Sequence, residues 1–203
     1  LGTNIVGGLS TAVGAYALST QNPATATDMY NVAVGYSAGA AVTTGIQNTL
    51  IGGSAGDALT DADNNIAIGT GALTSDTLGS MSIAIGVDAL FSQNFTTATN
   101  ALNTAVGLSA GQSVTTGVSN TLIGGRAGDA LTDADNNVAV GKEALSTDTL
   151  GSRSVAIGTA ALFTQNFTTA TNAYNTAVGH FAGGSVTTGI QNTLIGGLAG
   201  DAL

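Results

Sequence analysis

The chain of 203 residues has no cysteine, one proline and only three basic residues, and its formal net charge is −9. Without cysteine, neither disulfide bonds nor thiolate chemistry is available. An acidic chain repels both phosphate backbones and anionic lipid surfaces, which argues against nucleic-acid and membrane-surface partners. No apolar run approaches the roughly 20 residues that span a bilayer. We therefore expect no nucleic acid as a partner and no membrane insertion.

Charged residues make up only 7% of the chain, whereas 43% is apolar and 30 residues are glycine. Disordered chains combine low hydrophobicity with high charge, so this composition does not predict disorder. Collagen requires glycine at every third position, and these glycines do not follow that rule. The composition is that of a folded chain with an unusual source of regularity.

That regularity is a pentapeptide of Asn or Ser, then Thr, Val or Ile, then Ala or Leu, then Val or Ile, then Gly. Residues 48–52 are one copy. Eleven copies end at Gly14, Gly35, Gly52, Gly69, Gly86, Gly107, Gly124, Gly141, Gly158, Gly179 and Gly196. A period this short indicates a stacked array of repeats.

Successive motif glycines are 17 residues apart, except that every fourth spacing is 21, which gives a superunit of 72 residues. We interpret residues 1–203 as a single repeat array. The sequence at each end falls within a turn, and no polar capping repeat stands there, so we expect a segment of a longer fibre.

The apolar core of the motif is short and β-branched, which predicts a strand. Strand alternation places Thr49 and Ile51 on one face and Leu50 on the other. Because the Val/Ile column never changes type, we assign it to the interior and expect the Ala/Leu column to face outward. We expect a second short strand at the alanine that follows each motif glycine by three residues. Two strands and two turns per repeat predict an all-β, parallel β-solenoid of the flattened β-roll kind, with a three-faced coil as the alternative.

The four extra residues of each 21-residue turn form a loop that begins at Gln21, Gln93 or Gln165, and the only proline, Pro23, lies in the first of them. An outward apolar column along such a coil would mark an interface. We therefore expect the chain to associate with copies of itself.

The run Asn103-Thr104-Ala105-Val106-Gly107, followed by Ala110-Gly111 and a second pentapeptide at residues 120–124, resembles the repeat of phage tail fibres. Residues 154–158 are similar to the head repeat of trimeric autotransporter adhesins. The resemblance covers essentially the whole chain. The spacing of 17, with a regular turn of 21, departs from the usually shorter adhesin repeat and favours the viral fibre.

This resemblance implies a left-handed parallel β-roll assembled as a homotrimer. It also implies host or surface attachment, without catalysis and without a cofactor, with a bacterial trimeric adhesin head as the alternative. The location would be a virion tail fibre or an extracellular surface. Besides the chain itself, the partner would be a cell-surface glycan or a protein receptor.

Aromatic and ring-bearing residues of the long loops are candidates for surface binding, because they could contact sugar rings. Packing of the same side chains over the coil end, as a local cap, is the alternative. The candidates are Pro23, Phe95, Phe167, Tyr30 and Tyr174.

Three further functions were weighed against these expectations. Alternating Asp and Asn at residues 61–65 and 133–137 suit Ca²⁺, but no further acidic ligand follows and we expect solvated turns. Threonine pairs such as Thr43-Thr44 are similar to ice-binding surfaces, yet they form patches here. His180 is the only histidine, so the serines lack a recurring base, and only a carboxylate pair assembled across chains would allow glycoside hydrolysis.

Overall fold

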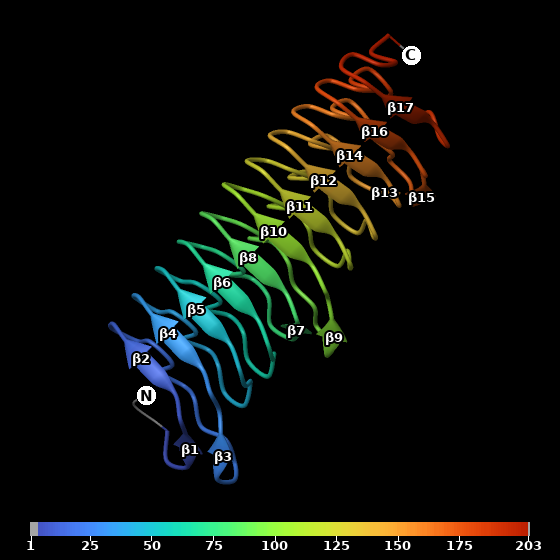
Figure 1. The fold of residues 1–203 in the computed structure, drawn as a ribbon. Coiled ribbons are helices and arrows are strands. Elements are labelled where there is room, and N and C mark those ends of the chain that lie inside the picture. The colour runs from blue at the N-terminus through green and yellow to red at the C-terminus, as the bar shows by residue number, and fades with distance from the viewer. Residues whose placement is uncertain (1–3, 203) are drawn as a thin grey trace. The chain divides into compact units, whose positions relative to one another are not determined.

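The computed structural model describes residues 4–202, which form an all-β parallel β-solenoid without any helix. The chain divides into two compact units, Leu1–Leu102 and Asn103–Leu203. Each unit is built from successive turns about 17 residues apart, and every turn contributes one three-residue strand (Figure 1). The first unit has five of these strands and the second has six. The parallel β-solenoid predicted from the spacing is confirmed.

The three-residue strands are the centres of the repeated pentapeptides. In the first unit they are β2 (Thr11–Val13), β4 (Val32–Val34), β5 (Thr49–Ile51), β6 (Ile66–Ile68) and β8 (Ile83–Ile85). In the second unit they are β10 (Thr104–Val106), β11 (Thr121–Ile123), β12 (Val138–Val140), β14 (Val155–Ile157), β16 (Thr176–Val178) and β17 (Thr193–Ile195). Within each unit neighbouring strands pair in parallel and in register, so that equivalent residues of the motif stack, as Leu50 does on Ala67.

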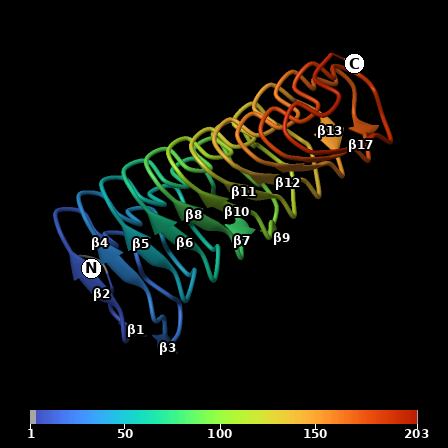
Figure 2. The ribbon, with the colours of Figure 1, turned by 45° about the horizontal axis from the view of Figure 1, so that its top comes forward.

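Among residues 4–202, short second strands occur only where a 21-residue turn meets the turn before it. They pair as β1 (Gly7–Gly8) with β3 (Thr27–Asp28), β7 (Gly79–Ser80) with β9 (Thr99–Asn100), and β13 (Gly151–Ser152) with β15 (Thr171–Asn172). Figure 2 shows β7 beside β9 in the first unit. Each pair holds the base of a long loop against the preceding turn.

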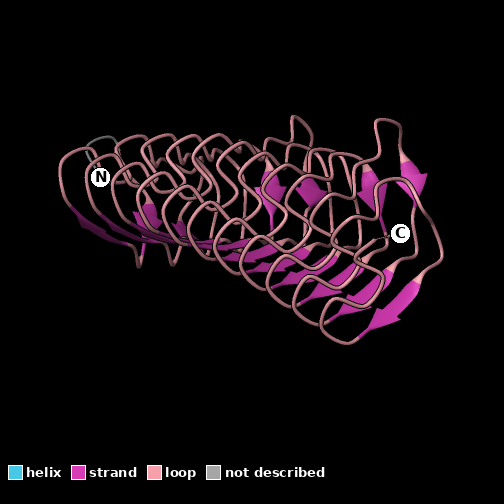
Figure 3. Cartoon of the chain, turned by 90° about the horizontal axis from the view of Figure 1, so that it is seen from above, coloured by secondary structure: helices cyan, strands magenta, loops and turns pink. Residues whose placement is uncertain are grey.

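The predicted second strand at the repeated alanines is wrong, because these segments are turns. The Ala55 N–H donates to the Gly52 carbonyl at 3.4 Å, and Ser54 between them has a φ of 53°. A positive φ at the third residue of a four-residue turn is typical of type II geometry, which an extended strand does not have. Figure 3 accordingly shows the three-residue strands along one side of the turns, with loops completing most of the rest.

The predicted inside and outside of the strands are also reversed. Ala33, Leu50 and Ala67 are fully buried, whereas Ile51 is 37% exposed. Asn precedes eight of the eleven strands and Ser the other three. This Asn lies on the same face as the Ala or Leu, and its amide bonds inward. Nδ2 of Asn48, for instance, donates to the carbonyl of Ala62 at 2.8 Å. The Ala/Leu column is therefore the interior, and the Val/Ile column faces outward.

Glycines leave space for the leucines of this narrow interior. A Cβ on Gly56 would lie 2.8 Å from Cδ2 of Leu50, so the glycine makes room for the leucine of its own turn. In the next turn the strand carries Ala67, and the equivalent of Gly56 is the fully buried Leu73. Close packing penalises overfilling. The turn of Ala33 also has a glycine, Gly39, although its strand residue is small, because a Cβ there would lie 2.6 Å from Cδ1 of Leu50 in the next turn.

Candidate functional site

The first candidate site is the outward face, by which we mean the first and third side chains of the three-residue strands in each unit. All of these residues are Thr, Val or Ile, and none is charged. In the first unit they are Thr11, Val13, Val32, Val34, Thr49, Ile51, Ile66, Ile68, Ile83 and Ile85. In the second unit they are Thr104, Val106, Thr121, Ile123, Val138, Val140, Val155, Ile157, Thr176, Val178, Thr193 and Ile195.

Side chains of the outward face are only partly covered within their own unit. Ile123 and Ile157 are each 39% exposed, and the remaining members are half-buried or exposed. Parallel pairing in register stacks the β-branched side chains into two columns. Monomeric soluble proteins rarely expose apolar patches beyond a few hundred Å², and larger patches mark interaction sites. An apolar stripe was predicted, but on the Ala/Leu column, which is buried.

The predicted surface-binding residues separate into two groups. Phe95 and Phe167 are each only 6% exposed, and Pro23 is also buried, so these three pack against the coil as the local-cap alternative describes. Tyr30 is 52% exposed and Tyr174 is 50% exposed, so both side chains are accessible. The Tyr174 ring also receives the Arg153 guanidinium at 5.8 Å from its centroid.

A buried carboxylate that the sequence reading missed anchors each of the two later long loops. Oδ1 of Asp148 accepts the N–H groups of Gly151 and Phe167, each at 3.0 Å, and Oδ2 accepts Nε2 of Gln165 at 2.6 Å. Asp76 makes the same three bonds in the first unit. These groups are buried, so every bond that is lost would leave a polar atom without a partner.

The first long loop differs in a way that explains this arrangement. Pro23 stands where the other loops have Phe and has no N–H to donate, and Asn4 stands where they have Asp. Asn4 accepts only the N–H of Gly7, at 2.7 Å, and the buried Nε2 of Gln21 has no partner. Aspartate therefore occurs in the loops where three donors need an acceptor, and asparagine occurs in the loop that has fewer.

The repeated asparagines form a buried column of hydrogen bonds in each unit. Oδ1 of Asn120 accepts the N–H of Asn137 at 3.0 Å, and Nδ2 of Asn120 donates to the carbonyl of Ala134 at 2.7 Å. One bond links adjacent turns and the other closes a single turn. Direct amide–amide bonds, such as Nδ2 of Asn120 to Oδ1 of Asn103 at 3.3 Å, are additional. The column is structural.

The Asp-rich turns direct their carboxylates at the preceding turn. Asp63 accepts the N–H of Ile46 at 2.8 Å, and Asp135 accepts the N–H of Val118 at 2.8 Å. Asp61 accepts the hydroxyl of Thr44. Among residues 4–202, no group of three or more His, Cys, Asp or Glu side chains is placed to hold a metal ion.

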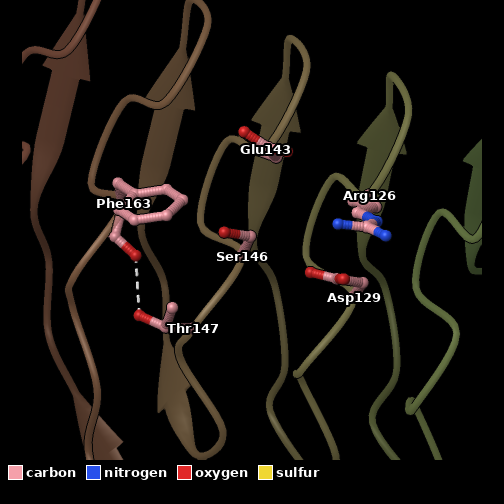
Figure 4. Close-up of a pocket in the computed structure, with 6 residues that line it drawn as sticks. All are labelled: Arg126, Asp129, Glu143, Ser146, Thr147 and Phe163. Carbon is pink, nitrogen blue, oxygen red and sulfur yellow. Dashed lines mark hydrogen bonds between the residues drawn. The ribbon is translucent and has the colours of Figure 1, made fainter.

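The second candidate site is a small open pocket of about 250 Å³ in the second unit (Figure 4). Its lining residues come from three successive turns: Arg126, Asp129, Glu143, Ser146, Thr147 and Phe163. The Thr147 hydroxyl is already used, because it donates to the Phe163 carbonyl at 2.6 Å. A second hollow of about 490 Å³ adjoins it, and its lining comprises Leu108, Gly125, Arg126, Lys142 and Glu143.

Across the two hollows the charged side chains are two cations and two carboxylates, and they are incompletely paired. Nζ of Lys142 lies 3.4 Å from Oε1 of Glu143, in an ion pair at the surface. Oδ1 of Asp129 is buried without a hydrogen-bond partner. Burial raises the pKa of the Asp129 carboxyl, while the nearby Arg126 guanidinium opposes the increase. Buried polar atoms without partners are uncommon, and each calls for an explanation.

Comparison of the chain with protein-family models, curated proteins and solved structures finds no match in any of the three. A search of residues 4–202 for a helix long and apolar enough to cross a lipid bilayer also finds none. The functional interpretation therefore depends on the residues and geometry of the two candidate sites.

Proposed function

We propose that the chain is a segment of a homotrimeric structural fibre that serves in attachment to a host or another surface, and that it is not catalytic. The observation that carries this proposal is the outward face, two columns of uncharged β-branched side chains that remain partly exposed within each unit. Burying an apolar surface in an interface is favourable by about 25 cal/mol per Å².

A second copy of the same chain is the partner that fits the outward face best. The columns repeat at the strand spacing of the solenoid, roughly 4.8 Å, so a matching partner needs the same spacing. Another copy supplies it at every turn. The outward face is uncharged while the whole chain has a net charge of −9, so copies can meet here without placing carboxylates opposite one another.

The number of copies and the role in attachment come from the resemblance of the pentapeptide to tail-fibre and adhesin repeats. We infer three chains around a common axis, in the left-handed β-roll that the resemblance implies. Location on a virion tail fibre fits the 17- and 21-residue spacing better than a bacterial adhesin head does. Continuous parallel ladders would give such a fibre rigidity, because strand edges remain only at its ends.

Light scattering coupled to size-exclusion chromatography tests the assembly. The wild type should have a mass of about 59 kDa, three times the 19.6 kDa of one chain. Ile123→Lys places a charge on the outward face and should give a monomer, because an unpaired charge buried in the interface is unfavourable. Ser185→Lys, an exposed site in the turns between β16 and β17, is the matched control and should stay trimeric. A monomeric wild type would contradict the proposal.

Ice binding is a second candidate, favoured by the regular spacing of the two outward columns. Five of the eleven strands have only Val or Ile at both outward positions, so threonine rows are broken in each unit. A monomeric wild type that showed thermal hysteresis would support ice binding. A trimer that buries the outward face would exclude it for that face.

A further inference from the structure

The corner after each motif glycine is one of the places at which the turns differ in sequence. We call the two residues that follow each motif glycine the corner ridge. In the first unit these pairs are Ala15-Tyr16, Tyr36-Ser37, Gly53-Ser54, Thr70-Gly71 and Val87-Asp88. In the second unit they are Leu108-Ser109, Gly125-Arg126, Lys142-Glu143, Thr159-Ala160, His180-Phe181 and Gly197-Leu198. The motif glycine and the alanine three residues after it are the same in every turn, so the ridge between them can vary and carry recognition, as one face often does in repeat proteins.

The ridge of the second unit holds most of the unusual chemistry of that unit. Arg126 and Lys142 are two of the three basic residues of the chain, and Glu143 is its only glutamate. Both hollows described above are lined by Arg126 and Glu143. The charged residues of the ridge and the two hollows thus lie at the same place, around Arg126 and Glu143.

The first unit contains the same turns without this site. Ser54 and Gly71 stand at the positions of Arg126 and Glu143. A Cβ on Gly71 would lie 2.5 Å from Oδ1 of Asp88, so a side chain there would require the Asp88 carboxylate to move. In the second unit the counterpart of Asp88 is Ala160, which removes both the obstruction and a like charge. The pocket therefore depends on coordinated replacements.

Asp129 shows a related difference. Its counterpart Asp57 accepts a hydrogen bond from the hydroxyl of Thr74, whereas Ser146 stands at the position of Thr74 in the second unit and no such bond forms. A carboxylate oxygen without a partner can accept a hydroxyl proton after a small rotation of its side chain.

Chemistry of the lining favours a neutral polyhydroxylated ligand. The pocket is lined by one cation, Arg126, and two carboxylates, Asp129 and Glu143. Lys142 of the adjoining hollow pairs with Glu143, so the four charges balance only across the two hollows and neither sign of ionic ligand is strongly preferred. Guanidinium and carboxylate groups respectively donate to and accept from hydroxyl groups. The half-buried Phe163 adds an apolar wall, and its ring lies 6.4 Å from that of Phe181. A volume of about 250 Å³ is slightly below the roughly 300–1,000 Å³ of pockets for drug-sized ligands, which suits a single ring.

We propose that the pocket around Arg126, Glu143 and Phe163 binds one pyranose ring of a surface saccharide. This inference rests on the proposed attachment function and names its ligand class. Each site is shallow and would bind in the millimolar range, and the copies present in an assembled fibre would raise the avidity.

Saturation-transfer NMR on the assembled wild-type chain tests the proposal. The probes are the methyl glycosides of glucose, galactose, mannose and N-acetylglucosamine. At least one should receive saturation, with its strongest signals on the ring protons that face Phe163. The double variant Arg126→Ser/Glu143→Gly introduces the residues of the first unit and leaves the net charge unchanged, and it should weaken binding at least tenfold.

The matched control is Arg153→Met, which removes the third basic residue, outside the pocket. Methionine is the residue at the equivalent position of the first unit, Met81. This control variant should bind the glycosides as the wild type does. No saturation of any glycoside, or equal binding by the double variant, would overturn the saccharide site. Light scattering on the same samples separates this failure from failure of the fibre proposal, because an intact trimer without sugar binding contradicts only the saccharide site.

Discussion

Replacing a motif glycine by alanine should destabilise the chain far more than the same replacement one residue later. Gly124 has a φ of 134°, and a Cβ placed on it would lie 2.5 Å from the carbonyl oxygen of Gly141 in the next turn. Gly125 has no positive φ, and its nearest such contact is the Leu108 carbonyl oxygen at 4.0 Å. The two variants thus add the same methyl group in opposite environments.

The two costs at Gly124 have different origins. An L-residue forced to a positive φ costs on the order of 1–3 kcal/mol. Overpacking against backbone that cannot move without opening the strand ladder costs about 1–3 kcal/mol more. Gly124→Ala should therefore lose about 2–6 kcal/mol, whereas Gly125→Ala should stay within about 0.5 kcal/mol of the wild type.

Urea unfolding followed by circular dichroism measures this difference, with both variants compared at one protein concentration because assembly contributes to stability. The midpoint of Gly124→Ala should fall well below that of Gly125→Ala. Equal midpoints would refute the close stacking of motif glycines in successive turns, since position 125 would then tolerate a side chain no better than position 124.

Three further predictions concern the interior and the pocket. Leu122→Ala should cost about 2–5 kcal/mol, measured by thermal unfolding. Asp148→Ala should cost about 3 kcal/mol or more, because three buried donors lose their acceptor, and amide hydrogen exchange at the base of that loop should accelerate. The pKa of Asp129 is raised above 3.8 in the folded chain, so its contribution to the free energy of unfolding is highest at acid pH and falls as pH rises above 3.8. Asp129→Asn should remove this decline, so the melting temperature of the variant should rise relative to that of the wild type between pH 3 and pH 7. If the two melting temperatures changed with pH in parallel, the prediction would be contradicted.

The fold could be predicted because its main determinant is a repeat that the sequence shows directly. Strand, turn and parallel register all follow from the spacing of the motif glycines and the β-branched residues between them. The inside and outside of the strand could not be assigned from column type alone. Leu50 is buried because Gly56 makes room for it, and that relation appears only when two positions of the same turn are compared.

The candidate site was harder to predict because it is marked by residues that differ between equivalent turns and not by a motif. Phe95 and Phe167 were conspicuous as aromatic loop residues, yet both are buried beside an aspartate that anchors the loop. Arg126 and Glu143 lie in different turns, and only the stacking of the turns places them at one pocket. Comparison of equivalent turns would have identified both positions as departures from the repeat.

Single-cysteine cross-linking tests the central claim most directly, because the natural chain has no cysteine to interfere. If the outward faces of identical chains meet around one axis, Ile123→Cys should oxidise to a covalent dimer, while Ser185→Cys, in the turns, should stay monomeric on a denaturing gel. Efficient cross-linking at residue 185 with none at residue 123 would show that the chains do not meet through the outward face.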